Sequence, residues 1–141
     1  MNNLCADIGY NSLNKYKEQL CGDHIECINQ EDGSSVIVLA DGLGSGVKAN
    51  ILSTLTSKII STMMAEGCDI DDCVSTIAAT LPVCSVRGIA YSTFTIIRLV
   101  NNQYAEIIQY DNPHVILLRN GNNVEFSKTV LKPKHKKLKL I

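Results

Sequence analysis

The chain has 141 residues, of which 45% are hydrophobic and 19% are charged, and its net charge is −1. This length and composition fit one globular domain with a hydrophobic core and exclude a disordered chain. The near-neutral charge gives no sign of nucleic-acid or membrane-surface binding, the apolar runs are too short to span a bilayer, and the N-terminus lacks a secretory signal pattern. We therefore expect a cytoplasmic protein without nucleic-acid or membrane partners.

The first predicted element is a β-hairpin. Residues Asp23–Asn29 alternate apolar and polar side chains, Asp32-Gly33 is a strong turn signal, and Val36–Ala40 is a β-branched run typical of a buried strand. A glycine-rich turn, Asp41–Gly46, follows the second strand.

Two helices are predicted next. From Lys48 to Glu66 the apolar side chains recur at helical period and Gly67 ends the helix; they stand at positions 51, 52, 55, 59, 60, 63 and 64. We expect this apolar face to be buried. A second helix, Asp71–Leu81, would be capped by Asp69 or Asp71 and would end before Pro82.

The remainder is predicted to be β-structure. Ile89–Val100 and Tyr104–Tyr110 would form antiparallel strands around the Asn101-Asn102 turn. A further hairpin, from Val115–Leu118 to Val124–Phe126, would turn at Asn120-Gly121. Strands in runs beside a block of helices indicate an α+β fold with a largely antiparallel sheet.

The six cysteines show no C-x-x-C spacing, and the three histidines are scattered singly. Zinc sites and structural disulfides usually need closer pairs or an oxidising compartment. We therefore expect Cys27 and Cys84 to be small buried hydrophobic residues.

The register of the predicted hairpin indicates which residues could form a functional site. If the turn is centred on Asp32-Gly33, then Asp23 or His24 faces Asp41 or Gly42 at the open end. Two carboxylates this close repel each other, unless one is protonated, both turn into water, or a hard cation binds between them. Alternation directs His24 to the opposite face, as an ordinary strand residue.

Two other interpretations of the glycine-rich turn compete with a metal site. The turn could be a flexible strand-to-helix connection in which Asp41 is merely solvated. Nucleotide binding is disfavoured, because Val47 stands where the dinucleotide fingerprint requires glycine and where the phosphate-binding loop requires lysine.

These residues carry a family resemblance. Cys21-Gly22-Asp23, and then a strand that leads into Asp41-Gly-Leu-Gly-Ser-Gly46, resemble the stage II sporulation protein E branch of the protein phosphatase 2C superfamily. In that family Gly-Asp opens a strand and Asp-Gly-Met-Gly-Ser-Gly ends the next, so Leu43 replaces a methionine. Weaker similarity continues through Ile89–Val100 and Asn112–Gly121.

The resemblance implies layered antiparallel β-sheets flanked by helices and a binuclear Mn²⁺ or Mg²⁺ site. Asp41 would bridge both metals, the Gly42 carbonyl would bind one, and Asp23 would bind the other. Metal-activated water would hydrolyse phosphoserine or phosphothreonine on a regulatory protein of the anti-sigma-factor-antagonist type.

The sequence departs from the family pattern at its C-terminus, because it lacks a later Asp-Gly motif and a final aspartate that complete the family's metal site. We therefore expect a phosphatase domain that is incomplete at its C-terminus (residues 1–131), a basic tail without globular pattern (132–141), and weak or no activity for this chain alone. The alternative is a catalytically inactive phosphatase-like regulatory or scaffolding module. Exposed sheet edges would also allow self-association.

Overall fold

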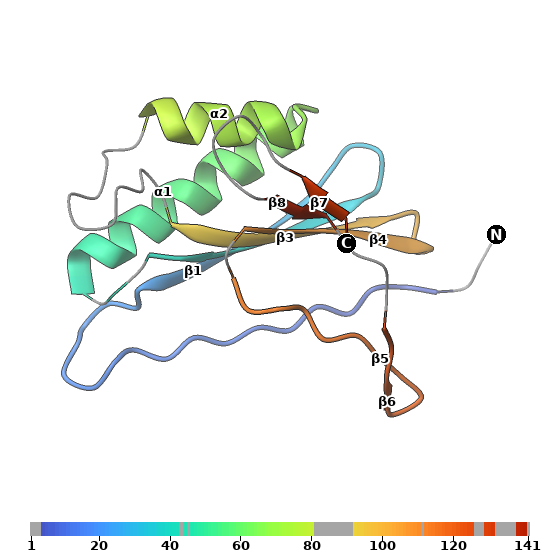
Figure 1. The fold of residues 1–141 in the computed structure, drawn as a ribbon, viewed down its shortest axis with the longest axis horizontal. Coiled ribbons are helices and arrows are strands. Elements are labelled where there is room, and N and C mark those ends of the chain that lie inside the picture. The colour runs from blue at the N-terminus through green and yellow to red at the C-terminus, as the bar shows by residue number, and fades with distance from the viewer. Residues whose placement is uncertain are drawn as a thin grey trace.

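The computed structural model describes residues 4–42, 44, 46–80, 92–110, 112–125, 129–131 and 138–140. Two helices cover one face of a six-stranded antiparallel sheet, and extended segments run beneath its other face (Figure 1). The elements in chain order are β1 (Asp23–Asn29), β2 (Ser35–Asp41), α1 (Gly46–Ala65), α2 (Ile70–Thr80), β3 (Thr93–Val100), β4 (Tyr104–Tyr110), β5 (Leu118–Arg119), β6 (Asn122–Asn123), β7 (Thr129–Leu131) and β8 (Leu138–Leu140). Among the described helices, none has the length and apolar character needed to cross a membrane.

The predicted β1–β2 hairpin is confirmed, and of the pairings expected at its open end the structure has Asp23 opposite Asp41. Its paired residues run from Asp23 opposite Asp41 to Asn29 opposite Ser35. The connecting turn is closed by a hydrogen bond from the Gly33 amide to the Gln30 carbonyl (3.0 Å), and Gly33 has φ +84°. Glycine suits this left-handed conformation because it has no Cβ.

The sheet has the strand order β1-β2-β3-β4-β8-β7. Alternate side chains of its central strands point to the helices, so Val36, Val38 and Ala40 are each fully buried on that face. Phe94 and Tyr110 stack on the same face, with ring centroids 5.3 Å apart. The core between sheet and helices therefore rests on β-branched and aromatic side chains from β2, β3 and β4.

Helix α1 is confirmed, but the predicted buried face is wrong in part. Ile51 and Leu55 are 50% and 41% exposed. The buried face consists mainly of small side chains: Ala49, Ser53, Thr56, Ser57, Ile60, Ser61 and Met64. All three of these serines donate hydrogen bonds to carbonyls three residues earlier, which lets them be buried, and their small size lets the helix approach the sheet closely.

Helix α2 follows prediction closely. The Asp72 amide donates a 2.9 Å hydrogen bond to Asp69 Oδ1, so Asp69 is the N-cap residue rather than Asp71. The predicted end of this helix at Leu81 and the first residues of the strand predicted at Ile89–Val100 lie outside the described residues.

Both predicted β-turns after the helices are confirmed. Asn101 and Asn102 have φ of +52° and +53°, as the tight turn between β3 and β4 requires. Asn120 and Gly121 also have positive φ, of +53° and +76°, and join β5 to β6. The strands of this second hairpin lie closer to the turn than predicted: β5 shares only Leu118 with the first predicted strand, and β6 ends before Val124, where the second was expected to begin. Phe126 lies outside the described residues.

Two predictions need correction. Leu138–Leu140 forms β8 and pairs with β4, although the tail was expected to lack structure. The physical reason is that β4 would otherwise be an edge strand with unpaired main-chain N–H and C=O groups. A short strand beside it can form hydrogen bonds with these groups. Cys27 is exposed rather than buried, because it lies on the edge strand β1 and faces away from α1; Cys84 lies outside the described residues.

Candidate metal centre

The two aspartates predicted as metal ligands lie opposite each other at the open end of the hairpin. Asp23 begins β1 and Asp41 ends β2, and the two are direct cross-strand partners. On its other side, Asp41 pairs with Thr93 at the start of β3, and Thr93 is buried. The antiparallel register thus brings together two carboxylates that are far apart in sequence.

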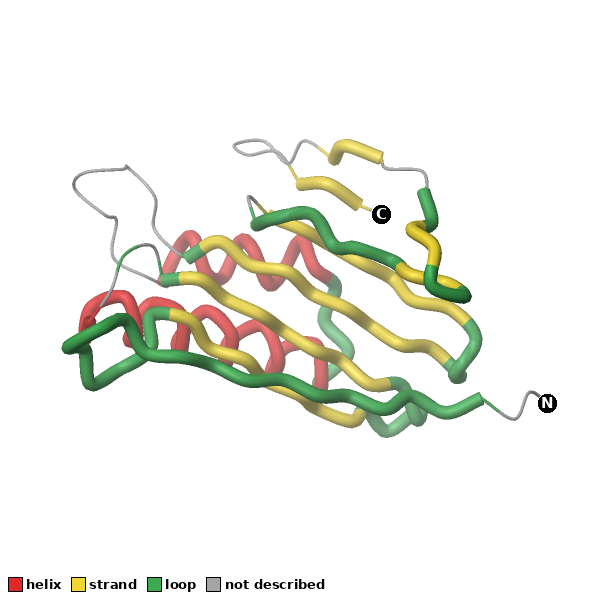
Figure 2. The backbone as a smooth tube through the Cα atoms, turned by 90° about the horizontal axis from the view of Figure 1, so that it is seen from below, coloured by secondary structure: helices red, strands yellow, loops and turns green. Residues whose placement is uncertain are grey.

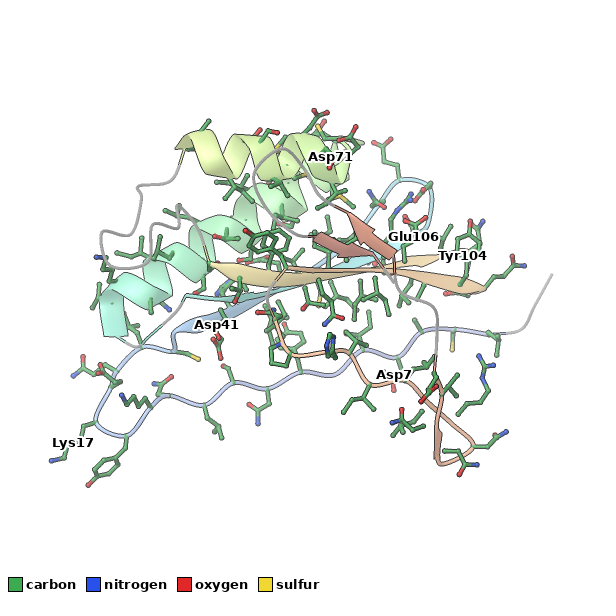
Figure 3. The ribbon with its side chains drawn as sticks, in the orientation of Figure 1. Asp7, Lys17, Asp41, Asp71, Tyr104 and Glu106 are labelled. Atoms are coloured by element: carbon green, nitrogen blue, oxygen red, sulfur yellow. The ribbon has the colours of Figure 1, made fainter. Side chains whose placement is uncertain are left out.

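Both aspartates belong to the sheet face that points away from the helices. Residues at even positions of β2, such as Ala40, enter the helix-facing core, so Asp41 projects to the other side. Figure 3 shows the Asp41 side chain directed away from α1 and α2. Asp23 is exposed and Asp41 is partly buried, so a cation from solution could reach the pair.

The two carboxyl groups interact directly. Partial burial, repulsion by the Asp41 charge, and a hydrogen bond with Asp41 together raise the pKa of Asp23 above its ordinary value of 3.8. A hydrogen bond between two carboxyls requires a proton on one of them. A cation at this position would replace that proton and offset the repulsion between the two charges.

Gly42, the third predicted residue, is held against helix α1. It is buried, and its amide donates a 2.9 Å hydrogen bond to the Gly22 carbonyl. A Cβ at position 42 would lie 1.9 Å from the Ala49 carbonyl oxygen, a distance that real atoms do not adopt. Glycine is therefore required here for the close approach of strand and helix, whatever its carbonyl binds.

A second contact between hairpin and helix was not predicted from the sequence. Asn50 Nδ2 on α1 donates a 2.8 Å hydrogen bond to the Cys21 carbonyl, just before Gly22-Asp23. Gly22 also lies close to this helix, because a Cβ there would stand 3.3 Å from the Ala49 Cβ. An asparagine inside a helix gives no sequence signal for such a role. Together these contacts fix the position of both aspartates relative to α1.

His24 is an ordinary strand residue, as predicted. Its Nε2 lies 2.7 Å from Glu26 Oε1, which also contacts Lys58 Nζ of α1 at 2.9 Å. These three side chains lie on the helix side of β1, away from Asp23. His24 therefore does not join the aspartate pair.

The donor set at this end of the hairpin fits a hydrated hard cation in part. Two carboxylates suit Mg²⁺ or Mn²⁺, which commonly retain several water ligands. In the part of the chain that the structure describes, no group of three or more His, Cys, Asp or Glu side chains could hold a metal ion. The hairpin thus brings together two carboxylates and a neighbouring glycine, which among the described residues do not form a complete protein cage for a metal ion.

The sequence of this chain matches the profile of a known protein family. The sequence profile of the stage II sporulation protein E (SpoIIE) family matches residues 31–133, which is well over half of the chain. This chain belongs to the SpoIIE family. The matched region includes Asp41 and Gly42, whereas Asp23 lies just before it.

Structural comparison supports the same fold class. The chain is similar to the solved structure of the PP2C phosphatase domain and a fragment of the regulatory domain of SpoIIE from Bacillus subtilis, with a TM-score of 0.57 and 22% sequence identity. The similarity covers 70% of this chain and 29% of that chain. At this identity it shows the fold, and the predicted phosphatase 2C-like α+β architecture is confirmed. No curated protein matches the chain.

Proposed function

We propose that this SpoIIE-family chain contributes the metal-binding hairpin of a Mg²⁺- or Mn²⁺-dependent protein serine/threonine phosphatase. The observation that carries the proposal is the pairing of Asp23 with Asp41 beside a hairpin end anchored on α1. The metal dependence and the phosphoprotein substrate come from the resemblance to the phosphatase 2C superfamily.

The residues of the chain would act by position and charge. Asp23 and Asp41 would hold the cation, while the contact of Gly42 with Ala49 keeps the end of β2 in place. A divalent cation bound there would activate water and offset the charge on the phosphoryl oxygens. The raised pKa of Asp23 means that cation and proton compete for this carboxyl.

Calorimetric titration with Mn²⁺ tests the proposed site directly. We expect saturable binding by the native chain and its loss in Asp41→Ala and Asp23→Asn. The matched control is Asp71→Asn, which removes an exposed carboxylate from the first turn of α2. Binding that Asp41→Ala leaves unchanged, or that Asp71→Asn weakens equally, would contradict the site.

A non-catalytic function is the second candidate. It is favoured by the small donor set, since the described residues bring only two carboxylates together at the hairpin. In this case the chain would act as a phosphatase-like regulatory or scaffolding module. Release of phosphate from phosphoserine peptides in Mn²⁺, lost in Asp41→Ala, would exclude it; Mn²⁺ binding without release of phosphate would favour it.

The substrate and location remain proposals as well. We propose a phosphorylated regulatory protein of the anti-sigma-factor-antagonist type as the substrate, and the cytoplasm as the compartment. Both follow from the family resemblance and from sequence composition rather than from a contact in the structure. Assay of the chain on phosphorylated candidates would test the substrate class.

A further inference from the structure

The turn of the β5–β6 hairpin contains a chemically reactive dipeptide. Where asparagine precedes glycine, the glycine amide nitrogen can attack the asparagine side-chain carbonyl and close a succinimide ring, because glycine has no Cβ to hinder the approach. Asparagine is accordingly counted among the thermolabile residues. Asn120-Gly121 is the one Asn-Gly step in the sequence.

The same ring can form, more slowly, where aspartate precedes glycine, and the chain has two such steps. In both, the structure engages the nitrogen that would attack. In Asp32-Gly33 the glycine amide donates a 3.0 Å hydrogen bond to the Gln30 carbonyl, and in Asp41-Gly42 it donates a 2.9 Å hydrogen bond to the Gly22 carbonyl. Ring closure at either step would first have to break that hydrogen bond.

Asn120-Gly121 has no such protection. Both residues are exposed, and nothing lies within 4 Å of a Cβ built on Gly121. Among the described residues, neither the Gly121 amide nor the Asn120 side chain forms a hydrogen bond with the protein. The nucleophile and the carbonyl that it would attack are therefore both accessible and unengaged in the folded chain.

The hairpin around this dipeptide is also short. Asn120 and Gly121 have φ of +53° and +76°, and only two residue pairs flank them, the inner of which is Arg119 with Asn122. In Figures 1 and 2 the hairpin lies near one end of the molecule, away from α1 and α2. An isolated two-stranded hairpin is marginally stable, so it offers little resistance to the main-chain rotation that ring closure requires.

We propose that Asn120 is a site of spontaneous deamidation in the folded chain. The Gly121 nitrogen loses its proton and bonds to the side-chain carbonyl carbon of Asn120, whose side-chain nitrogen leaves as ammonia. Water then opens the succinimide at one of its two carbonyls, which gives aspartate or isoaspartate at position 120. The net change is one water consumed and one ammonia released, and the reaction needs no enzyme, oxidant or cofactor.

Both products change the hairpin. Each adds a negative charge beside the exposed Arg119. Isoaspartate also lengthens the main chain by one carbon within the turn, and because the turn sets the register of a hairpin, it should abolish the pairing of β5 with β6. The six-stranded sheet that carries the aspartate pair contains neither strand, so this modification is independent of the proposed phosphatase chemistry.

Peptide mapping by mass spectrometry tests the proposal on the full chain. The folded protein is incubated in mildly alkaline buffer, which favours loss of the amide proton, and is sampled over time. We expect position 120 to show the mass change of amide-to-acid conversion, as two products separable by chromatography. Asn120→Gln should lose these products because glutamine requires a larger ring, and Gly121→Ala should lose them because of the added Cβ.

The native chain contains its own controls. Asn101 and Asn102 are also exposed and have positive φ, but the residue after each carries a Cβ, so both should remain asparagine. Asp32 and Asp41 should form isoaspartate only after unfolding in urea, when the hydrogen bonds of the following glycine amides are broken.

Several results would overturn the proposal. One is an intact Asn120 in the folded chain under conditions that convert a synthetic peptide with the sequence of residues 118–123. Another is conversion of Asn101 or Asn102 as fast as Asn120, and a third is isoaspartate at Asp32 or Asp41 in the folded chain at the rate seen at position 120. Product that persists unchanged in Gly121→Ala would also contradict the succinimide route.

Discussion

Gly42 lies against the backbone of Ala49, so that the end of strand β2 and the first turns of helix α1 are in direct contact. Asp41 directly precedes this contact, and Asn50 directly follows Ala49 and binds the Cys21 carbonyl. The candidate metal ligands are therefore attached to the helix from both strands of the hairpin. Movement of α1 would move the aspartates with it.

Gly42→Ala should destabilise the fold by about 1–3 kcal/mol or more, because the added methyl group must displace either β2 or α1. The measurement is chemical denaturation of the variant and the native chain. Gly9→Ala is the control, since nothing lies within 4 Å of a Cβ at that position. Similar stability of the two variants would show that strand and helix are less closely packed than the structure has them.

Asp23→Asn should stabilise the metal-free chain at neutral pH. Because the pKa of Asp23 is raised in the folded chain, the folded state binds this proton more tightly, and stability falls as pH rises from about 3.8 through the raised pKa. Denaturation of both proteins between about pH 3 and pH 7 should show the variant gaining on the native chain as pH rises. A difference that stays constant with pH would contradict the carboxyl–carboxyl contact.

A substitution at a polar position on the buried face of α1 should cost more stability than one at an apolar position on its exposed face. Ser57 is fully buried, so Ser57→Leu should cost about 1–3 kcal/mol by overpacking the seam between helix and sheet. Leu55 is 41% exposed, so Leu55→Gln should change stability by no more than about 0.5 kcal/mol. Thermal and urea denaturation would measure both. A larger loss of stability in Leu55→Gln than in Ser57→Leu would instead favour the apolar buried face that the sequence predicted.

Thiol labelling should separate Cys27 from Cys73. Cys27 is exposed, whereas Cys73 is buried, and desolvation by burial is the main cause that raises the Cys73 pKa to about 11. Near neutral pH we expect iodoacetamide to modify Cys27 in the folded chain and to modify Cys73 only after denaturation, because the thiolate is the reactive form. Mass spectrometry of the digested protein reads out both sites; equal labelling rates in the native state would contradict this burial.

The sequence predicted the elements that depend on local patterns. Alternation and the Asp32-Gly33 turn placed Asp23 or His24 opposite Asp41 or Gly42, and the structure selects the pair Asp23 and Asp41. The asparagine turns were also predicted, and the helix cap was narrowed to Asp69 or Asp71, because each depends on the conformational preference of a single residue or its neighbours. The family resemblance then singled out Asp23, Asp41 and Gly42.

Only the tertiary structure decided how the elements pack. Helical periodicity favoured a wholly apolar buried face on α1, but the face that meets the sheet consists mainly of small side chains such as Ser53 and Ser57, joined by Ile60 and Met64. Periodicity gives the spacing of side chains along a helix, not the distance to the surface it covers. For the same reason, the sequence did not predict that Gly42 meets Ala49, that Asn50 binds Cys21, or that β8 joins the edge of β4. Such long-range contacts depend on how closely distant segments approach, which no local pattern encodes.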